Sequence, residues 1–241
     1  KSWSLDLIQN LPLSGFKEWQ DDLKKAITFS PPHMSIYDLS IEDGTVFKRL
    51  INLGKLELPN DEEAFRNSES THFILKKSGY SRYEISNYCL PGHQSRHNRV
   101  YWSGSGWWSF GQGSTSSPWG EIFTRPRTSK EYKEWVNRQN ELNLDSSLIN
   151  KDFVYKELDE KIMLGLRLKE GVDIKKVFKE QNWENRKLKR NFSKLLEEWH
   201  RFLESGLLVR NGNRFFLSQP KGMELSNQVL ISMFKWWDEI N

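Results

Sequence analysis

The 241-residue sequence contains one cysteine, Cys89, and this scarcity excludes two kinds of structure. A single thiol cannot form a disulfide within the chain, and it cannot supply the several thiolates of a self-contained metal or iron–sulfur site. No apolar run approaches the roughly 20 residues that a membrane helix needs, and no signal peptide is visible. These absences predict a cytoplasmic protein without a transmembrane segment.

The sequence also lacks a strong excess of either charge. Its 36 Lys and Arg residues are interspersed with 32 Asp and Glu residues, which leaves a net charge of +4. Such a mixture is typical of a solvated surface and does not by itself indicate nucleic acid as a partner. Hydrophobic residues make up 37% of the chain. The chain can therefore bury a core, either as one large α/β domain or as a domain of about 150 residues with a smaller companion.

Strand and helix patterns alternate through the first half of the chain. Strands are expected at 3–9, 34–40, 81–87 and 107–110, and helices at 16–28, 61–78 and 128–139. This alternation predicts a parallel sheet with right-handed crossovers. Three or four strands make only part of a barrel, and the chain begins with Lys1 inside a strand-like run, so we expect a missing N-terminal part.

Residues 79–120 form the stretch most suited to a ligand. They contain two of the five histidines, the only cysteine, four of the eleven tryptophans and a glycine- and serine-rich run without helical or strand periodicity. In parallel sheets the functional loops follow the carboxyl ends of the strands. We therefore expect four loops to share one rim of the sheet: 6–10, 40–45, 87–102 and 111–120.

The second half of the chain is mainly helical. After a linker at 140–150, helices are expected at 151–169, 171–181, 184–204 and 221–240, with a hairpin at 207–217 before the last of them. This order predicts a winged-helix-like domain. The helix at 184–204 carries basic residues that could contact nucleic acid, but acidic residues share the same helix, which favours a solvated charged face.

A set of motifs then gives a family resemblance. The motifs are Asp6-Leu-Ile-Gln-Asn-Leu-Pro12, Tyr83-Glu-Ile-Ser-Asn87, Pro91-Gly-His93, Arg96-His-Asn98 with Tyr101-Trp102, and Gly111-Gln-Gly113-Ser-Thr-Ser116. In this order they resemble the radical S-adenosylmethionine family of oxygen-independent coproporphyrinogen III oxidases and HemW-type haem chaperones. The Tyr-Glu-Ile-Ser-Asn and His-Asn…Tyr-Trp motifs are similar to the HemW branch, and residues 115–127 resemble its cyanobacterial members.

The resemblance implies an α/β fold in two domains. Residues 1–139 would be the C-terminal part of a partial (β/α)6 radical S-adenosylmethionine barrel, 140–150 a linker, and 151–241 a HemN-type winged-helix-like domain. Intact members bind S-adenosylmethionine and a [4Fe–4S] cluster, the latter on a CxxxCxxC loop that this sequence does not contain. We therefore expect no radical chemistry from this chain alone, and whether it is an enzyme stays open.

The function implied is that of a HemW-like haem chaperone, which binds haem or a porphyrin and delivers haem to recipient proteins. Oxygen-independent coproporphyrinogen III oxidation is the alternative within the family. Outside the family, the alternatives are a winged-helix nucleic-acid module and a sugar-binding or hydrolytic α/β protein that uses its tryptophans as stacking platforms.

Three residues are implied contacts of S-adenosylmethionine: Asp6, Ser40 and Thr115. Asp6 lies in an apolar strand, where a carboxylate is costly unless it is paired, so backbone N–H groups of the sheet could equally account for it. Ser40 and Thr115 rest on the resemblance alone and could be ordinary loop residues.

Five residues are expected at a rim that meets haem or substrate: His93, His97, Asn98, Tyr101 and Trp102. A neutral imidazole can ligate haem iron. The same histidines and aromatic rings could instead form a hydrogen-bonded brace that orders the loop, and this interpretation is favoured. No residue is assigned a catalytic or metal-binding role.

Overall fold

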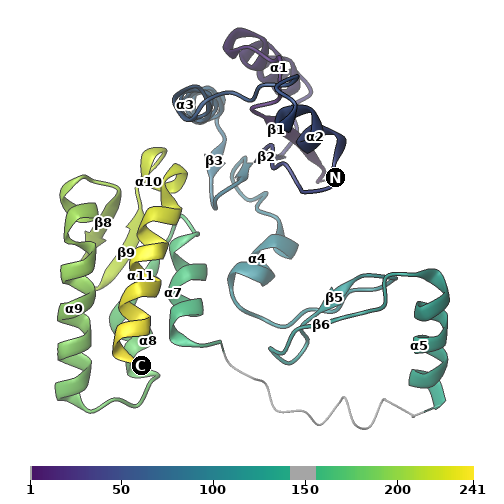
Figure 1. Cartoon of the computed structure of the whole chain (residues 1–241). Helices are drawn as coiled ribbons and strands as arrows, with labels where there is room; N and C mark the ends of the chain where they lie inside the picture. Colours follow the sequence, from purple (N-terminus) through teal and green to yellow (C-terminus); the bar gives the residue numbers. More distant parts are fainter. Residues whose placement is uncertain (1, 142–155) are drawn as a thin grey trace. The chain divides into compact units, whose positions relative to one another are not determined.

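The computed structural model describes residues 2–141 and 156–241 (Figure 1). They form two compact units, of which the first joins residues 1–95 to 166–241 and the second comprises 96–165. This grouping differs from the predicted domains 1–139 and 151–241, which remain a prediction. Most of the predicted linker 140–150 and the beginning of the predicted helix 151–169 lie outside the described residues.

The first unit contains a four-stranded sheet whose strand order is β1-β2-β4-β3. Its elements are β1 (Ser4–Gln9), α1 (Phe16–Thr28), β2 (His33–Asp38), α2 (Val46–Asn52), α3 (Asp61–Lys77), β3 (Ser81–Arg82) and β4 (Asn87–Cys89). β1 and β2 are parallel, as predicted, but β4 is antiparallel to both β2 and β3. The prediction of one parallel strand at 81–87 was therefore wrong.

A tight hairpin explains this difference. The Tyr83 N–H donates to the Asn87 carbonyl at 3.1 Å, which closes the turn. Inside the turn, the Arg82 Nε donates to the carbonyls of Glu84 and Ile85 at 3.3 and 2.9 Å. A side chain thus satisfies backbone acceptors that would otherwise pair with a neighbouring strand.

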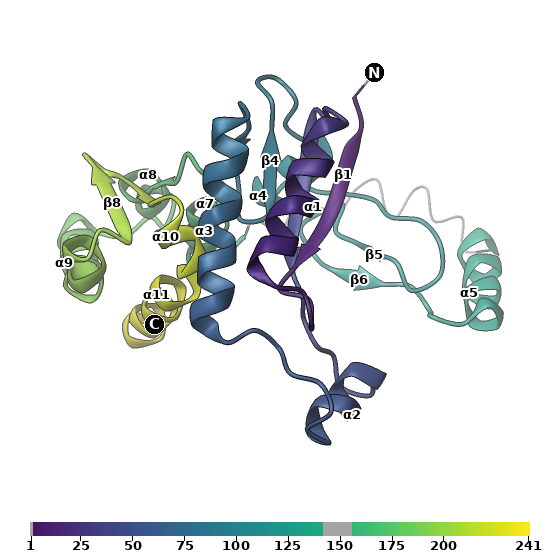
Figure 2. The ribbon, with the colours of Figure 1, turned by 90° about the horizontal axis from the view of Figure 1, so that it is seen from above.

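Helices α1 and α3 cover one face of this sheet (Figure 2). The buried residues of α1 are Trp19, Leu23 and Ala26, whose spacing of four and three residues places them on one helical face. They pack with Met34, Ile36, Leu75, Tyr80 and Tyr88. This core is the reason that the helices at 16–28 and 61–78 could be predicted closely.

Helix α2 lies between the predicted strand 34–40 and the predicted helix 61–78, where no helix was predicted. It begins after Thr45, whose hydroxyl accepts the Lys48 N–H at 3.2 Å. None of its residues is buried, and Val46 and Phe47 are exposed. Its apolar residues Val46, Phe47, Leu50 and Ile51 recur at helical spacing, but the helix is only seven residues long.

The second unit consists of α4 (Arg96–Trp102), β5 (Thr115–Ser116), β6 (Phe123–Thr124), α5 (Ser129–Glu141) and α7 (Leu158–Leu166). β5 and β6 form an antiparallel pair of their own. The predicted strand at 107–110 was wrong, because only Trp107 bridges to Ser117 there. Gly106 permits this approach, since a Cβ atom at that position would lie 2.2 Å from the Pro118 carbonyl oxygen.

The remainder of the first unit contains β7 (Val172–Asp173), α8 (Ile174–Lys179), α9 (Asn185–Glu204), β8 (Leu208–Asn211), β9 (Arg214–Leu217), α10 (Lys221–Glu224) and α11 (Ser226–Ile240). The predicted hairpin is present, and the short strand β7 adds to it in the order β7-β9-β8. Gly171 allows this addition, because its φ is +66° and a Cβ atom there would lie 2.0 Å from the Phe215 carbonyl oxygen. The predicted helix 221–240 is interrupted at Leu225.

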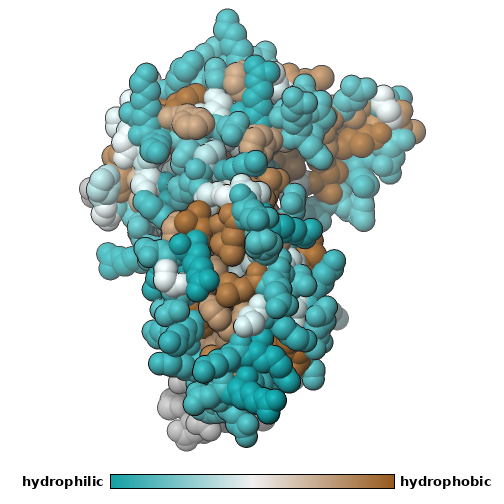
Figure 3. Space-filling view, turned by 90° about the vertical axis from the view of Figure 1, so that its left-hand side faces the viewer, coloured by the Kyte–Doolittle hydropathy of each residue, from teal (hydrophilic) through white to brown (hydrophobic). Residues whose placement is uncertain are grey.

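Helix α9 packs beside α11 (Figure 1) and buries Asn191, Leu195, Trp199 and Phe202. The basic residues considered for nucleic acid are all exposed: Arg186, Lys187, Lys189, Arg190 and Lys194. The side of the molecule in Figure 3 is correspondingly mostly hydrophilic. Across residues 2–141 and 156–241, no helix combines the length and the apolar character that crossing a membrane requires.

Candidate functional site

The sheet of the first unit has two chemically different faces. Leu5, Leu7 and Gln9 point toward the helices, since these β1 side chains are partly or fully buried. Successive side chains of a strand point to opposite faces of the sheet, and in β1, β2 and β4 the side chains on the other face are largely polar. We call this the polar face and define it by Ser4, Asp6, His33, Ser35 and Asn87.

Asp6 is an exposed residue of the polar face. Its carboxylate accepts a hydrogen bond from the Ser4 hydroxyl at 3.1 Å. The expectation that this carboxylate stands in apolar surroundings was therefore wrong, because the apolar neighbours Leu5 and Leu7 point the other way. An exposed carboxylate with one ordered partner can accept further hydrogen bonds from a ligand.

A chain of hydrogen bonds runs across the polar face from Tyr83 to Asp6. The Tyr83 hydroxyl lies 2.9 Å from His33 Nε2, and His33 Nδ1 lies 2.8 Å from the Ser4 hydroxyl oxygen. Both His33 and Tyr83 are buried. Burial lowers the pKa of His33, and the nearby Asp6 charge opposes this effect only in part.

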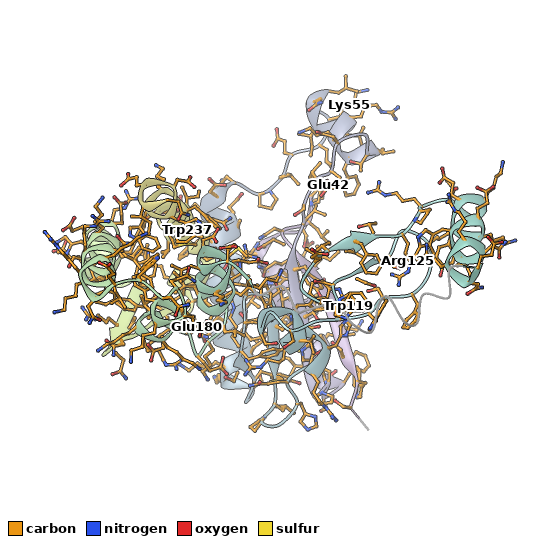
Figure 4. The ribbon with its side chains drawn as sticks, turned by 90° about the horizontal axis from the view of Figure 1, so that it is seen from below. Glu42, Lys55, Trp119, Arg125, Glu180 and Trp237 are labelled. Carbon is orange, nitrogen blue, oxygen red and sulfur yellow. The ribbon has the colours of Figure 1, made fainter. Side chains whose placement is uncertain are left out.

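Glu84 lies in the hairpin turn and is 1% exposed. Its carboxylate accepts hydrogen bonds from the Asn87 side chain and, at 3.2 Å, from the Ser86 N–H. Burial raises its pKa, while these hydrogen bonds and the Arg82 charge act in the opposite direction. The partners are all part of the turn, so Glu84 fixes the local structure of the hairpin. Glu42, by contrast, lies exposed in the loop before α2 (Figure 4).

The carboxyl ends of β1 and β2 carry a second polar network, on the helix side of the sheet. Gln9 donates to Asp38 at 2.9 Å and to Ser68 at 2.7 Å, and it accepts from Thr71 at 3.0 Å. A cavity of about 240 Å³ adjoins this network, and Arg82 is among its lining residues. Sequence reasoning missed this network; the only signal was the polar Gln9 at the end of an apolar strand.

The predicted common rim of four loops was wrong for residues 87–102. Because β4 runs antiparallel to β2, Cys89 lies opposite His33, at the amino end of β2. The Leu90 N–H then donates to the Pro32 carbonyl at 3.0 Å. The chain that follows β4 therefore leaves the sheet at the end opposite to Gln9 and Asp38.

The predicted S-adenosylmethionine residues fall in both units. Ser40 is exposed just beyond β2, where the Leu39 N–H donates to the Gln9 carbonyl at 3.2 Å. Asp6 thus lies in β1, and Ser40 follows the adjacent strand β2 of the first unit. Thr115 lies on β5 of the second unit, and its hydroxyl is 2.8 Å from that of Thr124.

The predicted haem-rim residues also divide between the units. His93 is exposed in the first unit, with its Nδ1 3.5 Å from the Ser2 hydroxyl. In the second unit, His97 Nε2 lies 3.1 Å from the Tyr101 hydroxyl, one helical turn along α4. Tyr101 in turn packs edge-on against Trp107 with ring centroids 4.8 Å apart. Asn98 and Trp102 lie on the same helix and are partly buried.

Two aromatic rings lie within cation–π distance of Arg125 of the second unit, which is labelled in Figure 4. The guanidinium lies 5.3 Å from the Phe123 ring centroid and 5.4 Å from that of Trp135. It also donates to the Ser116 hydroxyl at 2.8 Å. Arg125 is 6% exposed, so its charge holds the β5–β6 region together through cation–π contacts and a hydrogen bond.

The residues present do not fit an iron–sulfur cluster. Such a cluster needs several thiolates, whereas Cys89 is the one cysteine of the sequence and is buried in β4. In the part of the chain that the structure describes, no three His, Cys, Asp or Glu side chains are grouped so as to hold a metal ion. The described site therefore consists of hydrogen-bonding groups and aromatic rings.

Acidification is expected to destabilise the first unit through His72. Burial, the Arg82 charge and the Lys76 charge lower the pKa of His72 from 6.5 to about 4. The unfolded chain takes up a proton below pH 6.5, but the native protein does so only near pH 4. Stability should therefore fall as the pH drops through this window, by about 2 kcal/mol between pH 7 and pH 5. Urea unfolding at the two pH values measures this change.

Two variants identify His72 as the source of this change. His72→Phe should remove most of the contribution of His72 to the difference in the free energy of unfolding between pH 7 and pH 5. Phe29→Leu, a change at an exposed residue without a titratable group, should leave the difference unaltered. An undiminished pH dependence in His72→Phe would contradict the assignment.

Comparisons with known proteins agree with this architecture. Residues 156–225 match the HemN C-terminal domain family. The sequence is 34% identical over 249 residues to the haem chaperone HemW of Synechocystis, covering 99% of this chain and 60% of that protein. It is 31% identical to the haem chaperone HemW of Lactococcus lactis, covering 94% of this chain and 56% of that protein. The chain thus spans less than two thirds of the length of these relatives.

A solved structure with a similar fold is the coproporphyrinogen III oxidase HemN of Escherichia coli, described as a radical SAM enzyme. The two structures align with a TM-score of 0.65 over 97% of this chain and 55% of that chain, at 15% sequence identity. This similarity confirms the predicted α/β fold and its likeness to the C-terminal part of a radical S-adenosylmethionine protein.

Proposed function

Because the chain belongs to the family of HemW and HemN proteins, we propose that it serves as a HemW-type haem chaperone. In this function it takes part in binding haem and in delivering it to recipient proteins, in the cytoplasm. The observation that carries the proposal is the 34% identity to a protein named haem chaperone HemW, which extends over 99% of this chain.

We further propose that the polar face contributes to S-adenosylmethionine binding. Asp6 presents an exposed carboxylate that is held on one side by Ser4, and such an acceptor suits the hydroxyl groups of a ribose. Ser40 beyond β2 and Thr115 on β5 complete the proposed contacts. When bound with a cluster, this cofactor supplies radical chemistry. The residues of this chain are proposed only to bind and orient it.

Haem is proposed to meet the chain at His93, His97, Asn98, Tyr101 and Trp102. For His97 to bind iron, its Nε2 would have to exchange the Tyr101 hydroxyl for the metal, or the ring would have to turn and present Nδ1. The neighbouring aromatic rings offer the flat apolar surface that a porphyrin prefers.

The domain that follows is proposed to be winged-helix-like. Its support is the order of α8, α9 and the β8–β9 hairpin. Nucleic acid is not the proposed partner, because the exposed basic residues of α9 stand among the acidic residues Glu184, Glu197 and Glu204, which are also exposed.

Haem titration of the full chain tests the function. The wild-type protein is expected to shift and sharpen the Soret band of added haemin and then to transfer haem to an apo-haemoprotein. His97→Ala should weaken the Soret response if His97 ligates iron, whereas His200→Ala, a change on the exposed side of α9, should not. A wild-type spectrum identical to that of free haemin would overturn the proposal, and an unchanged titration in His97→Ala would overturn the ligand assignment alone.

A further inference from the structure

The hydrogen-bond chain on the polar face has only one consistent direction. Asp6 is a carboxylate and can only accept, so the Ser4 hydroxyl donates its single proton to it over 3.1 Å. The Ser4 oxygen must then accept from His33 Nδ1, which lies 2.8 Å away. The imidazole proton of His33 is thereby placed on Nδ1.

The other end of the chain agrees with this direction. A neutral imidazole with its proton on Nδ1 presents Nε2 as an acceptor, and the Tyr83 hydroxyl lies 2.9 Å from it. With Nε2 as the acceptor, the Tyr83 hydroxyl donates to His33, and the Tyr83 oxygen also accepts the Ser95 N–H over 3.4 Å. The lowered pKa of His33 keeps the ring neutral near pH 7.

The chain connects a rigid part of the fold to an exposed carboxylate. His33 and Tyr83 are 5% and 1% exposed, whereas Asp6 is an exposed residue. A free aspartate side chain samples several rotamers, and fixing it when a ligand binds costs conformational entropy. A carboxylate already held in one orientation avoids part of this cost.

We propose that His33 is a positioning residue for Asp6. Through Ser4 it holds the Asp6 carboxylate in the orientation that accepts hydrogen bonds from the ribose hydroxyls of S-adenosylmethionine. This inference rests on the proposed function of Asp6 and adds to it a buried group that touches no ligand. The tautomer of His33 is the feature that distinguishes positioning from simple packing, because packing would be served by either tautomer.

Nuclear magnetic resonance of the full chain tests the tautomer without any ligand. Long-range proton–nitrogen correlation spectra of the 15N-labelled protein separate protonated from unprotonated ring nitrogens, and the His33 signals are identified by their loss in His33→Gln. We expect Nδ1 to be protonated and Nε2 to be unprotonated. A His33 protonated on Nε2 would overturn the inference.

Calorimetric titration with S-adenosylmethionine tests the consequence. The side-chain NH2 of asparagine in His33→Asn lies near the position of His33 Nδ1, so it can still donate to Ser4. The side-chain NH2 of glutamine in His33→Gln lies nearer to the position of Nε2. We expect His33→Gln to bind about tenfold more weakly than the wild type and His33→Asn to recover most of the affinity. Thermal unfolding followed by circular dichroism establishes that both variants are folded.

The outcomes separate this inference from the proposed function. Equal affinity of the wild type and folded His33→Gln would overturn the positioning role while leaving the S-adenosylmethionine site intact. Loss of S-adenosylmethionine binding in Asp6→Asn together with unaltered binding in His33→Gln would likewise overturn the positioning role of His33 and leave the site intact. A wild-type chain that does not bind S-adenosylmethionine would overturn the ligand in both, whatever tautomer His33 adopts.

Discussion

Replacing Arg82 with methionine is expected to lower the free energy of unfolding by about 3–5 kcal/mol. Arg82 is 5% exposed and forms an ion pair with Glu224, whose side chain is 14% exposed. It also donates to the carbonyls of Glu84 and Ile85 in the hairpin turn. The methionine variant would leave a poorly solvated carboxylate and two carbonyls without their donor. Urea unfolding followed by circular dichroism measures the change.

A solvated pair offers the matched control for Arg82. Lys24 and Asp21 form a salt bridge whose side chains are 59% and 61% exposed. Lys24→Met should alter stability by less than about 0.5 kcal/mol, because water replaces the lost partner. The double variant Arg82→Met with Glu224→Met should be more stable than Arg82→Met alone, since it removes the stranded charge. An Arg82→Met protein within 1 kcal/mol of the wild type would contradict this account.

Replacing Trp236 with alanine is expected to cost about 3–5 kcal/mol. Trp236 of α11 is 0% exposed and stacks on Phe178, with ring centroids 5.5 Å apart and an angle of 7° between the rings. Its indole N–H donates to the Asn191 carbonyl at 3.0 Å. Alanine would leave a large cavity between α8, α9 and α11. The unfolding midpoint in urea should fall accordingly.

Trp199 separates packing from hydrogen bonding in the same core. It is also 0% exposed, but among the described residues its indole N–H has no hydrogen-bond partner. Trp236→Phe loses the hydrogen bond from the indole N–H to the Asn191 carbonyl, whereas Trp199→Phe removes an unsatisfied donor. We expect Trp236→Phe to be the more destabilising of the two by about 1 kcal/mol. An equal loss of unfolding free energy in Trp236→Phe and Trp199→Phe would show that the Trp236 hydrogen bond adds nothing to stability.

The helices that bury one apolar face could be predicted from the sequence. Trp19, Leu23 and Ala26 in α1 and Leu195, Trp199 and Phe202 in α9 recur at three- and four-residue steps, and these are the residues that pack in the core. The short helices α2 and α4 have seven residues each and bury none of them, so each offers at most two turns of pattern to recognise. Prediction therefore succeeded where packing determines the sequence.

The β3–β4 hairpin shows why the sheet topology could not be predicted fully. Residues 81–87 have the composition of a strand, and no glycine or proline within them signals a reversal. The turn instead depends on Arg82, whose carboxylate partner Glu224 lies 142 residues further along the chain. A partner so distant in the sequence cannot be identified from the pattern of neighbouring residues. For the same reason, the prediction that residues 87–102 share one rim of the sheet with the other three loops was wrong.

The resemblance supplied residues for the candidate site, which remain a prediction, and it supplied no geometry. Asp6 was singled out through the resemblance, and the structure places it on the exposed polar face beside Ser4. His33 was not singled out, and Tyr83 was named only as the first residue of a family motif and not as a site residue. Their part in the site depends on distances across neighbouring strands, to Ser4 at 2.8 Å and between their own side chains at 2.9 Å, which a linear sequence does not show.

The discontinuous first unit has a consequence for synthesis on the ribosome. Arg82 leaves the ribosome well before Glu224, and at about 5–20 residues per second the intervening 142 residues take on the order of ten seconds. During this interval residues 1–95 expose surfaces that residues 166–241 later cover. Residues 1–95 of the nascent chain should therefore recruit chaperones until residues 166–241 have been synthesised, and a ribosome-bound chain arrested before Glu224 should be digested by protease more readily than one that includes residues 166–241.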